Sequence, residues 1–391
     1  MMKKYLWSFA LSAVVLAGCG KKEEPPAPVA APAPVASAPA AAPVAVNTEE
    51  KVLNIYNWPD YVPEGMIAAF EAETGIKVNY DTFETNEALH AKLVAGNTGY
   101  DIVVPGSVFA KPQIEGGLLQ PLDKAKIKNL SNLDPAIMAT LAAKTDPDNK
   151  HLVPWAWGFT TVGINKTKVA KALGKMPMPE NAWDLVFKPE YTSKLKSCGI
   201  AYLDSPTEII PVALHYIGKD AYSNDVADYK AATDMLAKVR KDVRIFSSTM
   251  IDDIAGGKAC VAIGWSGDIN IAAGRAKENK SKDEIEALLP STGALIFFDT
   301  MALTKDAKHP NNAMAFIDFY LRAESAALMT NTMNYPTANK AAIDKIKPEI
   351  SGNKTIFVDA DYFAKMIAPS SFTNEAREAM ANAYNSFKKG K

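Results

Sequence analysis

From Leu53 onward, short apolar runs alternate with stretches that have the periodicity of amphipathic helices. The first series predicts strands at 53–58, 76–83 and 100–105, separated by helices at 63–74 and 86–95. This alternation is typical of an α/β chain with mostly parallel sheets, because neighbouring parallel strands need a crossover that a helix usually supplies. No internal repeat at solenoid periods is visible.

A second series begins near Thr160. It predicts strands at 199–203, 243–247, 260–265 and 294–299, and helices at 207–216, 228–239, 249–255, 311–321 and 324–332. The chain has 391 residues, of which 48% are hydrophobic, so it can build more than one packed core. We therefore expect two α/β units that face each other.

Unusual polar and aromatic residues fall at or just after the carboxyl ends of the predicted strands. They are Trp58 and Asp60, Gly106 and Ser107, the segment 204–208, the segment 265–268, and Asp299. In open α/β sheets this edge is where ligands bind. The pattern predicts one lined cleft between the two units.

The residue types in these motifs favour a cationic ligand. The aromatic residues are Trp58, Tyr61, Trp265 and Phe297, and the acids are Asp60, Glu208, Asp268 and Asp299. Carboxylates accept hydrogen bonds from ammonium groups, and aromatic faces attract the same cations. An anion would need basic residues, which the motifs lack, and a sugar would not require so many acids. A flexible dication with an apolar middle fits the motifs best.

Signals for catalysis, metal or cofactor binding are weak. The run Gly264-Trp265-Ser266-Gly267-Asp268 resembles a nucleophile elbow, but Asp268 replaces the last glycine and no histidine lies nearby in the sequence. The four histidines are widely separated and no phosphate-binding loop is present, so we expect neither a metal nor a cofactor. Glycoside cleavage by the cleft carboxylates is one alternative, and a thiaminase-like enzyme with a free nucleophilic cysteine is another.

The N-terminus has the layout of a secretory signal. Lys3 and Lys4 precede an apolar run at 5–16, and Leu16-Ala17-Gly18-Cys19 resembles the bacterial lipobox. We predict a signal peptide at 1–18, a lipid on Cys19, and an Ala/Pro-rich tether at 19–49. The alternative is an ordinary cleavage site with a chance cysteine.

Two cysteines, Cys198 and Cys260, remain in a chain that its signal sends to an oxidising compartment. A disulfide is expected, and two buried free thiols are the alternative. The formal net charge of -1, with scattered basic residues, argues against nucleic acid as a partner.

The same residues carry a resemblance to a known family. The stretches Ile55-Tyr56-Asn57-Trp58, residues 100–105, residues 261–265 and Phe297-Phe298-Asp299 resemble those of the periplasmic putrescine- and spermidine-binding proteins of ABC importers. The resemblance implies a two-lobed type II periplasmic binding protein fold, with a central mostly parallel sheet in each lobe and a ligand cleft between the lobes. Lobe 1 would comprise 50–156 and 297–342, and lobe 2 would comprise 157–296 and 343–391.

The resemblance also implies a ligand-binding set and partners. The residues carried over are Trp58, Asp60, Tyr61, Glu208, Trp265, Asp268, Phe297, Asp299 and Tyr335, and Ser107, just after the third predicted strand, completes the predicted ligand-binding set. It implies a Cys198–Cys260 disulfide, a polyamine ligand, with putrescine placed before spermidine and cadaverine, and membrane permease subunits as partners. Together with the lipobox-like run, we expect a lipid-anchored periplasmic monomer. A polyamine sensor that serves no transporter is the alternative.

Two positions depart from the family pattern. Pro59 stands where the family usually has a serine or threonine, and Gly106 stands where it has a serine, so that Ser107 comes one position late. Phe297, in place of a second tryptophan, favours putrescine over spermidine.

Overall fold

The computed structural model describes residues 48–390, so the predicted signal peptide, Cys19 and almost all of the predicted tether lie outside the described residues. At the start of the described chain, the Glu49 carboxylate accepts hydrogen bonds from the backbone amides of Asn311 and Asn312. The strands are β1 (Val52–Asn57), β2 (Lys77–Thr82), β3 (Ile102–Val103), β4 (Leu119–Gln120), β5 (Val153–Asn165), β6 (Ile200–Tyr202), β7 (Ile245–Phe246), β8 (Val261–Trp265), β9 (Ile285–Ala287) and β10 (Leu295–Thr304).

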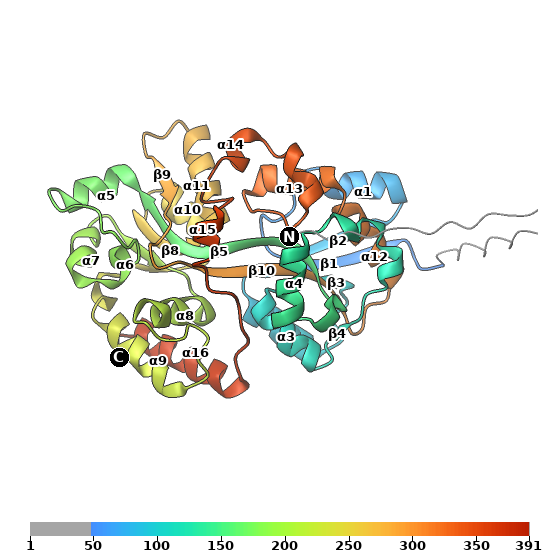
Figure 1. The fold of residues 1–391 in the computed structure, drawn as a ribbon, viewed down its shortest axis with the longest axis horizontal. Helices are drawn as coiled ribbons and strands as arrows, with labels where there is room; N and C mark the ends of the chain where they lie inside the picture. The colour runs from blue at the N-terminus through green and yellow to red at the C-terminus, as the bar shows by residue number, and fades with distance from the viewer. Residues whose placement is uncertain (1–47, 391) are drawn as a thin grey trace, which may run out of the picture. The chain divides into compact units, whose positions relative to one another are not determined.

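Helices connect and cover these strands (Figure 1). They are α1 (Met66–Thr74), α2 (Asn86–Ala95), α3 (Ser107–Glu115), α4 (Pro135–Lys144), α5 (Lys166–Leu173), α6 (Asp184–Phe187), α7 (Pro189–Leu195), α8 (Pro206–Tyr216), α9 (Val226–Ala237), α10 (Met250–Ala255), α11 (Ser266–Glu278), α12 (Pro310–Tyr320), α13 (Ala323–Met333), α14 (Pro348–Ser351), α15 (Ala360–Phe363) and α16 (Asn374–Lys388). Short 3₁₀ turns cover Lys124–Lys126, Lys128–Asn132, Pro147–Asn149, Arg240–Asp242 and Lys340–Lys345.

Local chemistry explains the helix boundaries next to the cleft. The Thr85 hydroxyl accepts a hydrogen bond from Ala88 N at the start of α2. α1 ends at Gly75, whose φ of 67° lies in the left-handed region that glycine adopts readily. β1 alternates half-buried and buried residues, as expected of a strand with one face against a core.

The two halves of the fold share a sheet through two long crossing strands. The strand order is β2-β1-β3-β10-β5-β8-β6-β7, and β5 and β10 run side by side between two groups of helices (Figure 1). β1 pairs parallel with β2 and β3, and β6 pairs parallel with β7 and β8. β10 runs antiparallel to β3 and β5, and β5 runs antiparallel to β8.

These pairings confirm the two-lobed α/β fold. Within each half the inner strands pair in parallel. The two crossing strands, β5 and β10, run antiparallel to every strand that they pair with. β5 is buried along its whole length.

Each half has its own hydrophobic core. The first core contains Leu53, Ile55, Phe70 and Ile102, together with Phe316 of α12. The second contains Ile200, Ile210 and Ile263, and Met380 and Tyr384 of α16 return to it from the end of the chain. Ala326 of α13 packs with Ile346 and Ile350 in a smaller cluster. The lobe boundaries given above stay a prediction.

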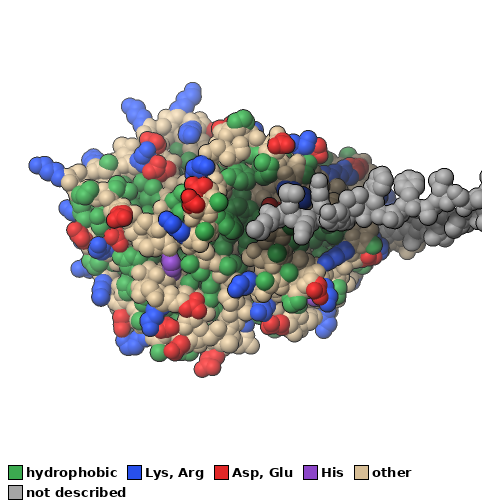
Figure 2. All heavy atoms as spheres, in the orientation of Figure 1, with side chains coloured by type: hydrophobic (Ala, Val, Ile, Leu, Met, Phe, Trp, Pro, Cys, Tyr) green, Lys and Arg blue, Asp and Glu red, His purple; other side chains and the backbone are tan. Residues whose placement is uncertain are grey.

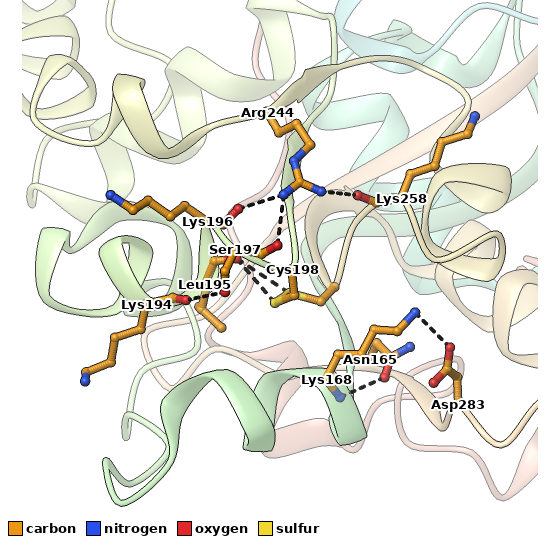
Figure 3. Close-up of a disulfide and its surroundings, with 11 residues drawn as sticks. Asn165, Lys168, Lys194, Leu195, Lys196, Ser197, Cys198, Arg244, Lys258 and Asp283 are labelled. Carbon is orange, nitrogen blue, oxygen red and sulfur yellow. Dashed lines mark hydrogen bonds and ion pairs between the residues drawn. A yellow bond between two sulfur atoms is a disulfide. The ribbon is translucent and has the colours of Figure 1, made fainter.

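Cys198 and Cys260 form a disulfide within the second half, as expected. Arg244 lies next to it and donates hydrogen bonds to the carbonyl oxygens of Lys196, Ser197 and Lys258 (Figure 3). The guanidinium thereby ties together the two segments that carry the cysteines.

The surface carries no stripe of one charge on the face that Figure 2 shows, where lysine, arginine and acidic side chains are interspersed. None of the helices within 48–390 has the length and apolar character needed to cross a bilayer.

Candidate ligand-binding site

A cavity of about 230 Å³ lies where the strand ends of the two halves meet. Its volume is below the roughly 300–1,000 Å³ typical of sites for drug-sized ligands, which suits a small ligand. All ten residues of the predicted ligand-binding set line it: Trp58, Asp60, Tyr61, Ser107, Glu208, Trp265, Asp268, Phe297, Asp299 and Tyr335. The structure thus brings together residues that are up to 277 positions apart in the chain, from Trp58 to Tyr335.

Three carboxylates of the predicted set line this cavity and each accepts a hydrogen bond from a hydroxyl group. Tyr61 donates to Asp299 Oδ2 at 2.7 Å, Tyr335 donates to Asp268 Oδ1 at 2.6 Å, and Thr160 donates to Glu208 Oε2 at 2.5 Å. Asp299 is 7% exposed, and the other two carboxylates are half-buried at the cavity wall. No lysine lines the cavity, and the arginine in the described lining, Arg275, pairs with Asp60 and Asp252, so these acids have little compensating positive charge.

The acids resist ionisation as a result. Burial raises the pKa of Glu208 to about 7, although hydrogen bonds from Thr160 and Trp265 lower it in part. Burial likewise raises the pKa of Asp299 to about 7, against the hydrogen bond from Tyr61, and the charges of Glu208 and Asp268 add to the rise. The pKa of Asp268 is raised to about 6, again mainly by burial. A bound cation would favour the ionised form of all three.

Aromatic rings complete the walls. The ring centroids of Trp58 and Trp265 are 6.2 Å apart, and those of Phe297 and Tyr335 are 6.3 Å apart. Trp58 Nε1 donates to Val104 O at 2.9 Å, which fixes that indole on the first half. Such rings can contact a hydrocarbon chain and attract an ammonium group.

The glycine and serine in the run 264–268 have packing roles, so the run does not need to be read as a nucleophile motif. A β-carbon on Gly267 would lie 2.3 Å from the ring of Tyr335, so only glycine fits while that ring holds Asp268. The Ser266 hydroxyl is buried and accepts a hydrogen bond from Phe159 N at 3.4 Å. Ser266 therefore has a structural role. Among residues 48–390, no three His, Cys, Asp or Glu side chains gather in a way that could hold a metal.

Asp60 differs from the other acids, because its side chain is 65% exposed and pairs with Arg275 of α11 at 3.6 Å. Arg275 also pairs with Asp252 at 3.0 Å. Arg275 lines the cavity and was missed by the sequence reasoning, which considered only the motifs themselves. The ion pair joins the two halves at the edge of the cavity.

Two further cavity-lining segments were not predicted from the sequence. One follows β2 and includes Asn86 and Glu87, and the other follows β7 and runs from Ser248 to Asp252. Both lie after strands, so the signal used elsewhere could have found them. Thr207 donates to Glu87 Oε1 at 3.0 Å, which forms a second contact between the two halves.

Fold and site together define a class: a two-lobed solute-binding protein whose cleft suits a small cation. The model of the family described as "Bacterial extracellular solute-binding protein" matches residues 65–358. The chain is 43% identical over 345 residues to the putrescine-binding periplasmic protein PotF of Escherichia coli (strain K12), which covers 88% of this chain and 93% of PotF.

A second relative and a solved structure are similar to the chain over most of its length. The putrescine-binding periplasmic protein SpuD of Pseudomonas aeruginosa (strain UCBPP-PA14) is 41% identical, over 89% of this chain and 95% of SpuD. Among solved structures, the spermidine/putrescine ABC transporter substrate-binding protein PotD of Streptococcus pneumoniae superposes with a TM-score of 0.71 at 27% identity, over 87% of this chain and 99% of that one. The chain belongs to the bacterial extracellular solute-binding proteins, and within them to the polyamine-binding proteins of the putrescine type.

Proposed function

We propose that this protein is the extracytoplasmic substrate-binding component of an ABC importer for a small polyamine, and that putrescine is its preferred ligand. The observation that carries the proposal is the set of three carboxylates whose pKa values burial raises, placed between aromatic faces with no lysine in the lining. The similarity to putrescine-binding relatives supports the same ligand. It also supports binding rather than catalysis, which sets the glycosidase and thiaminase alternatives aside.

The ligand would bind as a dication. One ammonium group would contact Asp268 and the other Asp299 or Glu208, while the methylene groups lie against Trp58, Trp265 and Phe297. Desolvating an ammonium group is costly without a charge partner, so the two lobes would close stably only around a ligand that supplies the matching charges. The contacts Thr207–Glu87 and Arg275–Asp60 join the two halves across the cavity in this structure.

Titration calorimetry with putrescine, cadaverine, spermidine and spermine tests the proposal. The variants Glu208→Gln and Asp268→Asn keep the side-chain shape and remove the charge, and Asp344→Asn, on the exposed surface, is the matched control. We expect putrescine to bind most tightly and each cavity variant to lose at least about tenfold in affinity, since hydrogen bonds to charged groups contribute about 1.5–3 kcal/mol. Absence of heat with every amine would refute the proposal.

We further propose that the mature protein is a periplasmic monomer anchored by a lipid on Cys19, beyond a signal peptide and a tether. The lipobox-like run before Cys19 supports this part. Labelling cells with a radioactive fatty acid should mark the protein, and Cys19→Ser should abolish the label and release the protein from membranes. A label that survives the substitution would contradict the anchor.

A further inference from the structure

The cavity wall at the start of α3 differs from the walls at the other helices. α2, α8 and α11 each place a carboxylate in the first turn, and these three residues, Glu87, Glu208 and Asp268, line the cavity. The first turn of α3 contains no acid, and Gly106 before it offers no side-chain cap. No acid of α3 itself therefore compensates the free amides and partial positive charge of this helix start, which favours a hydrogen-bond acceptor over an ammonium group.

Ser107 gives this wall a polar group that lacks a partner. It is 2% exposed and lines the cavity. Within the described chain, its buried hydroxyl oxygen has no hydrogen-bond partner. Buried hydroxyl groups are nearly always paired, so an unpaired one at a cavity wall points to a ligand group.

Asn86 adds a second donor at the same place. Its Oδ1 accepts a hydrogen bond from Gly106 N at 2.9 Å, which fixes the orientation of the side-chain amide. A β-carbon on Gly106 would lie 3.0 Å from Asn86 Nδ2 and 3.5 Å from Asp299 Oδ1. The asparagine donor and the carboxylate oxygen that Tyr61 does not engage thus both lie near the point that a β-carbon on Gly106 would occupy, where glycine leaves them accessible.

We infer that the cavity also takes a monoacylated diamine, such as N-acetylputrescine. An amide group offers one donor and one acceptor, whereas an ammonium group offers donors only. The amide N–H would donate to Asp299 Oδ1, and the carbonyl oxygen would accept from Ser107 Oγ and Asn86 Nδ2. The free ammonium end would contact Asp268. The inference rests on the proposed function, because it uses the same cavity and the same acids.

The test compares two ligands in the wild-type protein and in three variants. Calorimetry at pH 8 measures the dissociation constants of putrescine and N-acetylputrescine. Ser107→Ala removes the unpaired hydroxyl, and Asn86→Asp exchanges the donor for an acceptor of the same shape. Ser193→Ala, an exposed serine outside the cavity, is the matched control.

We expect the wild-type protein to bind both amines. The ratio of the two dissociation constants should shift about tenfold against N-acetylputrescine in Ser107→Ala and in Asn86→Asp, because one hydrogen bond is worth about that factor. The ratio should not change in Ser193→Ala. The wild-type comparison needs no substitution, so it remains informative even if a variant fails to fold.

The outcomes separate this inference from the proposed function. Binding of putrescine without binding of N-acetylputrescine would overturn the inference and leave the proposed function intact. Binding of neither amine would overturn the proposed function itself, and the inference with it. Binding of both, with an unchanged ratio in Ser107→Ala and Asn86→Asp, would overturn the assignment of the acyl group to the start of α3.

Discussion

Replacing Asp299 by asparagine should stabilise the ligand-free protein. Burial raises the pKa of this carboxyl from 3.8 to about 7, even though Tyr61 donates a hydrogen bond to it. A carboxyl whose pKa is higher in the folded state contributes stability below the unfolded pKa and loses it as the pH rises through the folded pKa. The difference between 3.8 and about 7 corresponds to about 4 kcal/mol at pH 8.

Asparagine keeps an oxygen for the Tyr61 hydrogen bond and carries no charge. Asp299→Asn should therefore raise the free energy of unfolding at pH 8 by up to about 4 kcal/mol, and by only about 1–2 kcal/mol at pH 5. The same variant should bind putrescine at least about tenfold more weakly, because an ammonium group loses its charged partner. The Asp299 carboxylate thus favours ligand binding and lowers the stability of the ligand-free protein.

Urea unfolding at pH 5 and pH 8 measures this effect, with Asp344→Asn as the surface control. A stabilisation at pH 8 that shrinks at pH 5 supports the reasoning. If Asp299→Asn destabilises the ligand-free protein at pH 8, the fold itself stabilises the charge, and the role given to the ligand is wrong.

Three further results are expected. Glu208 and Asp299 each have a pKa of about 7, and binding needs their ionised forms. The affinity for putrescine should therefore fall about tenfold for each of them between pH 8 and pH 6. An affinity that calorimetry finds unchanged over this range would contradict this prediction. Opening the Cys198–Cys260 disulfide, whose cysteines are 62 residues apart, should lower stability by about 4 kcal/mol on the chain-entropy model, and an unchanged thermal midpoint in Cys198→Ser/Cys260→Ser would contradict it. Arg275→Gln should speed putrescine release only about two- to fivefold in stopped-flow measurements, because the ion pair with the exposed Asp60 is solvated. A hundredfold faster release would contradict this weak contribution of the ion pair.

Much of the fold could be predicted from periodicity and helix boundaries. The helix expected at 86–95 is α2 as observed, because Thr85 caps it and Gly96 follows it. The long strand β5 could not be located in the same way. It is buried on both faces, so its sequence lacks the alternation by which a half-exposed strand is recognised, and no strand was predicted at its position.

The cavity was predictable to the extent that strand ends reveal it. The residues after β1, β8 and within β10 carry conspicuous aromatic and acidic side chains, and all of them reach the cavity. Arg275 lies at the far end of α11, where no strand end marks it. The unpaired state of Ser107 and the position of Asn86 beside Gly106 depend on tertiary packing, so no sequence pattern could indicate them.

A crystal structure of the protein grown with putrescine tests the central claim most directly. The account predicts a diamine inside the cavity, with one nitrogen about 3 Å from an oxygen of Asp268 and the other about 3 Å from an oxygen of Asp299 or Glu208, and with its carbon chain against Trp265 and Phe297. A diamine bound elsewhere, or a cavity that holds no diamine at saturating concentration, would contradict it.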